Sequence, residues 1–132
     1  MTPYKIRRST MFALSLVAVC ILCGAIGQTL MKTGMSEVGE IGGLGELFNP
    51  STVSRIFTNV YVIGGLLLYA SFAILWLGAL SNLDVSFMYP LLSLAYVVTA
   101  ILGFIFLKED ITLLRWAGIG LVVAGCFMIL RS

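Results

Sequence analysis

The amino-acid sequence predicts an all-α integral membrane protein, built as a bundle of four transmembrane helices. Of its 132 residues, 60% are apolar and 11% are charged, whereas soluble domains carry roughly 25% charged residues. The charged residues cluster and leave four long uncharged runs between them. Because a helix crosses the bilayer with about 17–25 residues, we expect one membrane domain over residues 1–132 in which each run forms a span.

The first predicted span covers residues 11–31, and an interfacial connection over residues 33–49 follows it. The connection is rich in glycine, and its apolar residues recur every three positions, which favours a loose helical turn on the membrane surface. Asn49 and Pro50 are typical of a helix start, with asparagine as the N-cap and proline in the first turn. The second helix then crosses the bilayer over residues 56–80.

The third predicted span covers residues 85–107, with Asp84 as its N-cap. The fourth span covers residues 113–130, in the shortest uncharged run. Arg115 must therefore extend its side chain to the interface, where an aromatic residue such as Trp116 is also well placed.

Four spans place both chain ends on one side of the membrane. Lysine and arginine divide equally between the two sides, so insertion in one or in both orientations stays open. The basic residues before the first span weakly favour ends that lie inside the cell.

The composition excludes several classes of function. The chain has no histidine, the commonest general base and metal ligand, and no charged residue lies deep in a predicted span. A net charge of +2 provides no basic face for nucleic acid. Cys20, Cys23 and Cys126 lie in apolar runs and are interpreted as small packing residues. We expect no enzymatic activity, no metal, no cofactor and no nucleic-acid partner.

The third span carries a face of polar and small residues. Ser86, Tyr89, Ser93 and Tyr96 recur every three or four positions and therefore share one side of a helix. Lipid does not stabilise a row of hydroxyl groups, so this face should look inward and contact a substrate. Pro90 lies on it and is a candidate hinge. Ordinary hydrogen bonding between helices is the alternative.

Two other spans offer candidate binding residues. Gln28 and Lys32 are four residues apart on the first helix, and Lys32 at headgroup depth is suited to a phosphate group; it is equally suited to anchor the helix. Tyr69 and Trp76 share a face of the second helix and are candidates for lining a cavity, with plain packing as the alternative.

The fourth span suggests an assembly. Gly118 and Gly125 are seven residues apart and allow close helix contact. Four packed helices enclose only side chains, so a path for a solute requires a second copy or a paralogous subunit. We therefore expect a dimer with these glycines in its interface. Packing within the same bundle is the alternative.

Three stretches resemble the drug/metabolite transporter superfamily: Gly27–Lys32, Tyr89–Leu94, and Lys108 and Glu109 followed by Arg115, Trp116 and Gly118. The chain is similar to a single four-helix EamA-type unit, and especially to the small subunits of the aminoarabinose-phosphoundecaprenol flippase. The resemblance implies a homodimer or heterodimer in the bacterial inner membrane that moves a polyprenyl-phosphate-linked sugar.

The small multidrug resistance proteins share this architecture and carry an essential glutamate in their first helix. The matching position here is Gly24, which argues against proton-coupled export of cations. Export of small solutes remains an alternative function, and so does the role of an accessory membrane subunit that transports nothing.

Overall fold

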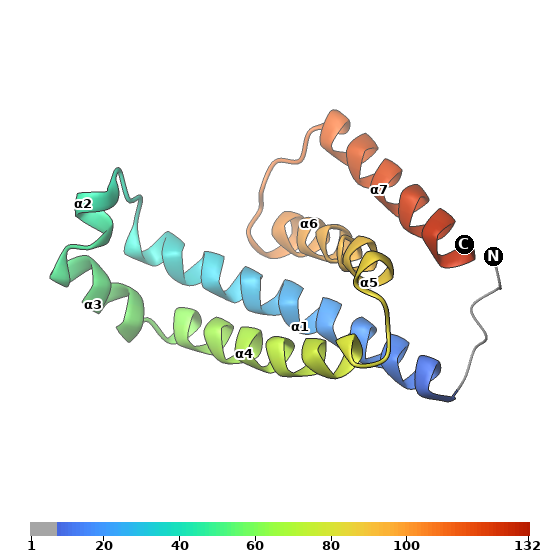
Figure 1. Cartoon of the computed structure of the whole chain (residues 1–132). Coiled ribbons are helices and arrows are strands. Elements are labelled where there is room, and N and C mark those ends of the chain that lie inside the picture. The colour runs from blue at the N-terminus through green and yellow to red at the C-terminus, as the bar shows by residue number, and fades with distance from the viewer. Residues whose placement is uncertain (1–7) are drawn as a thin grey trace.

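The structure is a computed structural model that describes residues 8–132, and within them all regular structure is helical (Figure 1). The helices are α1 (Arg8–Val38), α2 (Leu44–Leu47), α3 (Pro50–Thr58), α4 (Val60–Leu80), α5 (Val85–Leu92), α6 (Leu94–Phe106) and α7 (Leu113–Arg131). Lys5 and Arg7, which bear on the expected orientation, lie outside the described residues.

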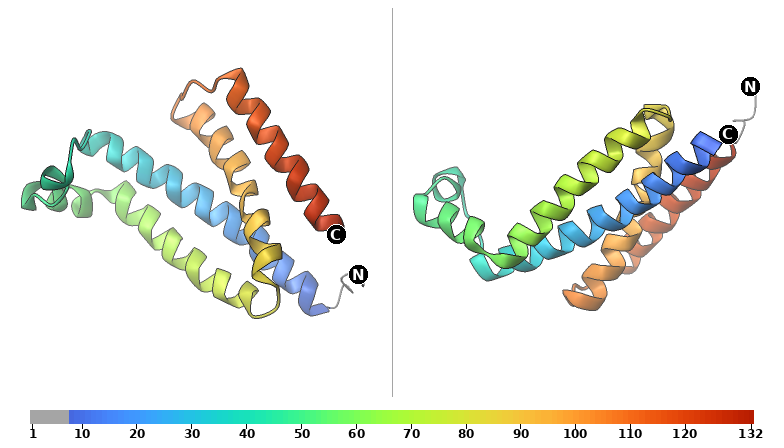
Figure 2. Two further views of the ribbon diagram at one scale, coloured as in Figure 1. Left: turned by 45° about the horizontal axis from the view of Figure 1, so that its top comes forward. Right: turned by 90° about the horizontal axis from the view of Figure 1, so that it is seen from below.

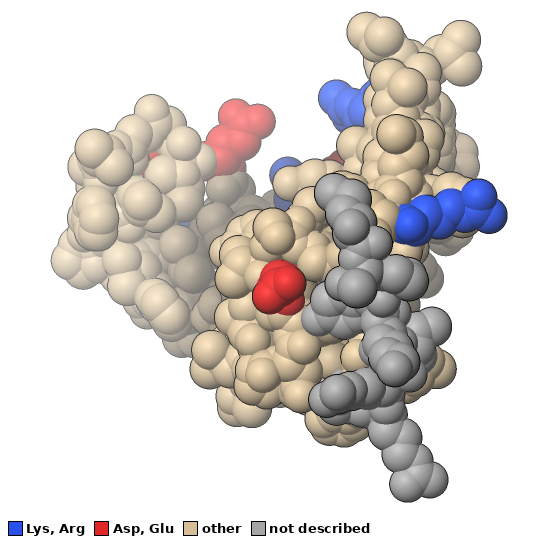
Figure 3. All heavy atoms as spheres, turned by 45° about the vertical axis from the view of Figure 1, so that its right-hand side comes forward, with Lys and Arg blue, Asp and Glu red and all other residues tan. Residues whose placement is uncertain are grey.

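Within residues 8–132, four helical segments are long and apolar enough to cross a membrane. They are Thr10–Val38, Val60–Leu80, Val85–Phe106 and Leu113–Arg131. The expected all-α fold with four spans is therefore confirmed, and the third span consists of α5 and α6 together. The start of α1 and the end of α7 lie at the same end of the molecule (Figure 2). On the face drawn in Figure 3, charged side chains are few and lie scattered among the other residues.

Helix α1 continues to Val38, seven residues beyond the expected end of the first span at Met31. The hydroxyl groups of Thr33 and Ser36 bond to carbonyls one turn back, so these polar residues fit a helix. The guanidinium group of Arg55 donates to the carbonyl of Val38 at the helix end. The polar residues after Met31 thus mark the edge of the membrane, whereas the helix itself ends later.

The start of α3 is confirmed, because the side chain of Asn49 accepts the N–H of Ser51 at 3.1 Å and Pro50 opens the helix. The second helix is, however, divided at Asn59. Its side chain accepts the N–H groups of Tyr61 and Val62 and so caps a new helix, α4. The backbone of Asn59 is extended, so α3 ends there. Because its side chain accepts hydrogen bonds from the first free N–H groups of the following segment, a new helix starts at the same residue.

Helix α1 lies between α4 on one side and the α5–α6 unit on the other, and α7 packs on the far side of that unit (Figures 1 and 2). Glycines bring α1 and α4 close together, since a Cβ atom on Gly65 would lie 2.6 Å from the carbonyl oxygen of Gly27. A small apolar core forms where α1 begins and α4 turns into α5; it contains Ala13, Val17, Ala79, Leu83, Met88 and Leu91.

Candidate functional site

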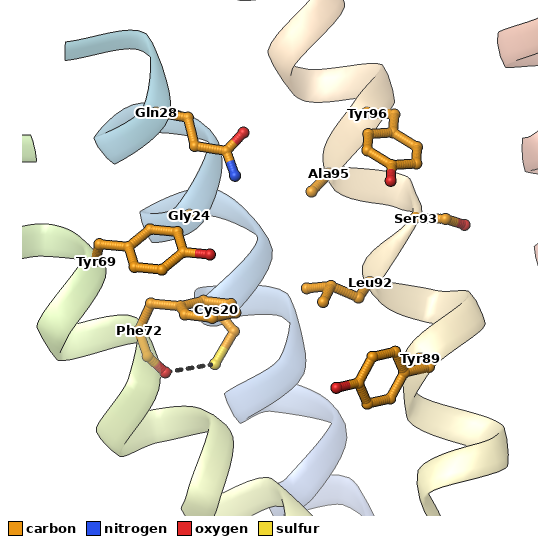
Figure 4. A pocket seen from close by; sticks show the side chains of 10 residues that line it. All are labelled: Cys20, Gly24, Gln28, Tyr69, Phe72, Tyr89, Leu92, Ser93, Ala95 and Tyr96. Carbon is orange, nitrogen blue, oxygen red and sulfur yellow. Dashed lines mark hydrogen bonds between the residues drawn. The ribbon is translucent and has the colours of Figure 1, made fainter. Parts of the chain in front are cut away.

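A pocket of about 250 Å³ opens between α1, α4 and the α5–α6 unit (Figure 4). Its walls come from three of the four spans, so it lies within the membrane-crossing part of the chain. The lining residues are Cys20, Gly24, Gln28, Tyr69, Phe72, Tyr89, Leu92, Ser93, Ala95 and Tyr96.

The pocket brings together five residues that the sequence singled out as candidates. Gln28 of α1 and Tyr69 of α4 face Tyr89 and Tyr96 across the opening (Figure 4). Ser93 also borders the pocket, but its side chain points away from it. The helical periodicity thus selected faces that the tertiary structure places around one cavity, and the role of these residues in binding a substrate stays a prediction.

Trp76 does not line the pocket but supports the rings that do. Its ring stacks on Phe72 with a centroid distance of 5.9 Å and an angle of 16°. It also meets Tyr89 edge to face at 5.7 Å. Phe72 in turn lies against α1, because Gly24 has no side chain there; a Cβ atom on Gly24 would lie 3.4 Å from the Phe72 ring. The aromatic wall thus joins α4 to α1 and α5.

Lys32 lies outside the pocket, in a separate depression that it shares with Met35, Ser36, Gly39 and Glu40. It is exposed and sits four residues after Gln28 on α1, which corresponds to a rise of about 6 Å along the helix. The sequence placed Lys32 and Gln28 on one face, and the structure keeps that face but separates the two side chains by one turn.

No acidic side chain lines the pocket, although all six acidic residues belong to the described part of the chain. Glu37 accepts the side-chain N–H of Asn59 at 2.8 Å, and Glu46 accepts the N–H of Gly42 at 2.9 Å. The others are Glu40, Asp84, Glu109 and Asp110, all exposed. The pocket therefore offers hydroxyl groups, an amide and aromatic rings, but no buried anion.

The expected hinge region at Pro90 coincides with a break in the third span. Helix α5 ends at Leu92, α6 begins at Leu94, and Ser93 forms the junction. Cys126 of α7 contacts this junction, with its sulfur 3.0 Å from the hydroxyl oxygen of Ser93. Sequence reasoning interpreted Cys126 as a packing residue and missed this contact, because nothing local in the sequence pairs positions 93 and 126.

In the part of the chain that the structure describes, the glycines of α7 have open space beside them. Among residues 8–132, a Cβ atom on Gly118 or on Gly125 would meet no atom within 4 Å, so no described segment packs closely against either glycine. This face of α7 is open.

Residues 44–131 match the model of the EamA-like transporter family, and they make up two thirds of the chain. The chain belongs to the EamA-like transporter family. The match covers α2 to α7 and includes α4, α5 and α6, three of the four helices that form the pocket walls. This EamA-like chain is accordingly a membrane transporter protein and not an enzyme.

Curated relatives extend the likeness over α1. A probable 4-amino-4-deoxy-L-arabinose-phosphoundecaprenol flippase subunit ArnF from Shewanella sediminis is 32% identical over 89% of this chain and 86% of its own. The corresponding ArnF of Erwinia tasmaniensis is 34% identical over 77% of this chain and 81% of its own.

A probable subunit ArnE of the same flippase, from Hamiltonella defensa, is 34% identical over 53% of this chain. That alignment spans a little over half of the ArnE protein, 57% of its length. No solved structure matches the chain.

Proposed function

We propose that this EamA-like chain is a subunit of a flippase that moves a polyprenyl-phosphate-linked sugar across the bacterial inner membrane. The observation that carries the proposal is the pocket within the spans, walled by Gln28 and by tyrosines from three helices. The relatives named as subunits of a phosphoundecaprenol sugar flippase support the substrate class.

The pocket of a single chain can take part of the head of such a lipid, but it cannot enclose the whole head. Its volume of about 250 Å³ lies below the roughly 300–1,000 Å³ of pockets that enclose a whole small ligand. Tyr69, Tyr89 and Tyr96 are 41%, 59% and 66% exposed, so the opening faces outward between the helices. A sugar ring can enter from the side while the polyprenyl chain stays in the lipid.

The chemical groups of the pocket also suit a sugar. The amide of Gln28 can both donate and accept hydrogen bonds, as can the tyrosine hydroxyls, and sugar hydroxyls need both. The aromatic rings provide flat apolar surfaces for the C–H faces of a sugar ring. We assign the phosphate to Lys32, one turn towards the membrane surface, where its ammonium group forms a charge-assisted hydrogen bond at headgroup depth.

We further propose that the active unit is a dimer, either of two copies or of this chain with a paralogous four-helix subunit. The pocket of one chain is too small and too open to enclose the lipid head. The open glycine face of α7 accepts another helix without a steric penalty. Relatives named as two different subunits, ArnE and ArnF, support the heteromeric form.

The decisive experiment is a flipping assay in reconstituted vesicles with fluorescent polyprenyl-phosphate sugars. This chain is tested alone and together with a candidate paralogous subunit. The movement of lipid between leaflets is measured by quenching the fluorescence of the lipid in the outer leaflet. We expect Lys32→Ala to abolish movement and Lys32→Arg to retain part of it. Lys108→Ala is the matched control, because Lys108 is exposed in the α6–α7 connection and lies outside the pocket.

Normal flipping by Lys32→Ala would show that Lys32 only anchors α1 and would remove the assigned phosphate contact. Absence of flipping by every combination of chains, together with uptake of a small cation by the same vesicles, would favour the exporter function instead. Absence of both activities would favour an accessory role.

A further inference from the structure

The break between α5 and α6 has a local hydrogen-bond pattern of its own. Pro90 has no N–H and so cannot continue the α-helical bonding at its position. The N–H of Ser93 bonds to the Pro90 carbonyl at 3.1 Å, and the N–H of Tyr96 bonds to the Ser93 carbonyl at 3.0 Å. Both bonds span three residues instead of four, which is the tighter geometry of a 3₁₀ turn.

Cys126 ties this break to α7. It is 3% exposed and is the buried residue of a helix that otherwise lies on the surface. Its thiol donates to the carbonyl oxygen of Pro90 at 3.0 Å and lies 3.0 Å from the Ser93 hydroxyl oxygen. The Ser93 hydroxyl also bonds to the Pro90 carbonyl. The Cys126 thiol and the Ser93 hydroxyl thus both bond to the Pro90 carbonyl and also contact each other.

This Pro90–Ser93–Cys126 group lies directly behind a wall of the pocket. Tyr89 lines the pocket from α5 and Tyr96 lines it from α6. The angle between α5 and α6 therefore determines the positions of Tyr89 and Tyr96 relative to each other in the pocket wall. Figure 4 shows the Ser93 side chain turned away from the pocket, and its oxygen contacts Cys126 there.

We propose that Cys126 is a positioning residue, whose thiol holds α7 on the α5–α6 break and so maintains the arrangement of the pocket wall. Hydrogen bonds between membrane helices are weak, and their loss corresponds to roughly a threefold to twentyfold shift in an equilibrium. The break should therefore open more often without Cys126, while the four spans remain folded. This inference goes beyond the proposed transport and needs no substrate.

Hydrogen–deuterium exchange of the full-length protein in lipid nanodiscs measures this opening at the amides of residues 91–97. Cys126→Ala removes the thiol, Cys126→Val removes it but keeps a buried apolar side chain, and Cys126→Ser keeps a donor. We expect exchange about threefold to twentyfold faster in the alanine and valine variants. The serine variant should exchange at a rate close to that of the parent. Cys23→Ala is the matched control, because Cys23 lies outside both the pocket and the break.

Parent-like exchange in Cys126→Val would show that Cys126 only fills space, and the proposal would be overturned. Exchange in the alanine variant no faster than in Cys23→Ala would overturn it as well. If Cys126→Ala does not fold, Ser93→Ala removes the other side-chain partner and is expected to speed exchange in the same segment. Unchanged exchange in Ser93→Ala would then contradict the proposal. Because flipping is measured separately, failure of the proposed function leaves this result unaffected.

Discussion

Replacing Gly65 with alanine is expected to force α1 and α4 apart beside the pocket. A Cβ atom on Gly65 would lie 2.5 Å from the Met31 side chain and 2.6 Å from the carbonyl oxygen of Gly27. The flexible side chain of Met31 can move aside, but the carbonyl oxygen moves only with the backbone of α1. Gln28 follows Gly27 directly and Tyr69 lies one turn from Gly65, so separation of the helices displaces both pocket residues.

The neighbouring Gly64 allows the magnitude to be worked out by comparison. A Cβ atom there would meet only the Leu30 side chain, at 4.0 Å. Both alanines gain about 1 kcal/mol of helix propensity, and this gain cancels in the difference between the variants. What remains is the cost of overpacking, about 1–3 kcal/mol. We expect Gly65→Ala to be less stable than Gly64→Ala by this amount.

The free energy of unfolding can be measured by titrating SDS into mixed micelles while circular dichroism follows the helix content. Gly64→Ala should unfold at the same or a higher SDS fraction than the parent, and Gly65→Ala at a lower one. Equal stability of the two variants would refute the reasoning, because it would mean that α1 and α4 do not approach closely at Gly65.

Two further predictions concern surfaces that are open in the single chain. Gly118→Leu combined with Gly125→Leu should weaken dimer formation in single-molecule photobleaching without unfolding the chain, whereas Gly120→Leu should not; an unchanged dimer would place the interface elsewhere. Phe48 is 73% exposed between α2 and α3, and we propose that it inserts into the headgroup region. A spin label at position 48 should then be more accessible to oxygen than one at Glu46, and equal accessibility would contradict the insertion.

Local patterns in the sequence determined the spans and several helix starts. Long uncharged runs predicted four membrane-crossing segments, and four such segments are present. Asn49 caps α3 through its side chain, and Asp84 occupies the N-cap position of α5, although its side chain forms no capping bond. These features are predictable because hydropathy and capping depend on a few consecutive residues.

Helical periodicity also determined which residues share a face, and this was enough to select most of the candidate site. Gln28, Tyr69, Tyr89 and Tyr96 were chosen from three predicted spans and line one pocket. The period of 3.6 residues places side chains on a common face whatever the helix packs against. The period does not reveal which helix packs against a given face. That these faces surround one pocket therefore followed only from the structure.

Only the tertiary structure decided the details that depend on contacts between helices. It placed Lys32 in a depression separate from the pocket and turned the Ser93 hydroxyl towards Cys126, 33 residues away in the sequence. Lipid solvates an apolar helix face as well as another helix does, so hydrophobicity cannot select the partner. Selection rests on close fits such as Gly27 against Gly65 and on hydrogen bonds at the break, which exist only when distant segments meet.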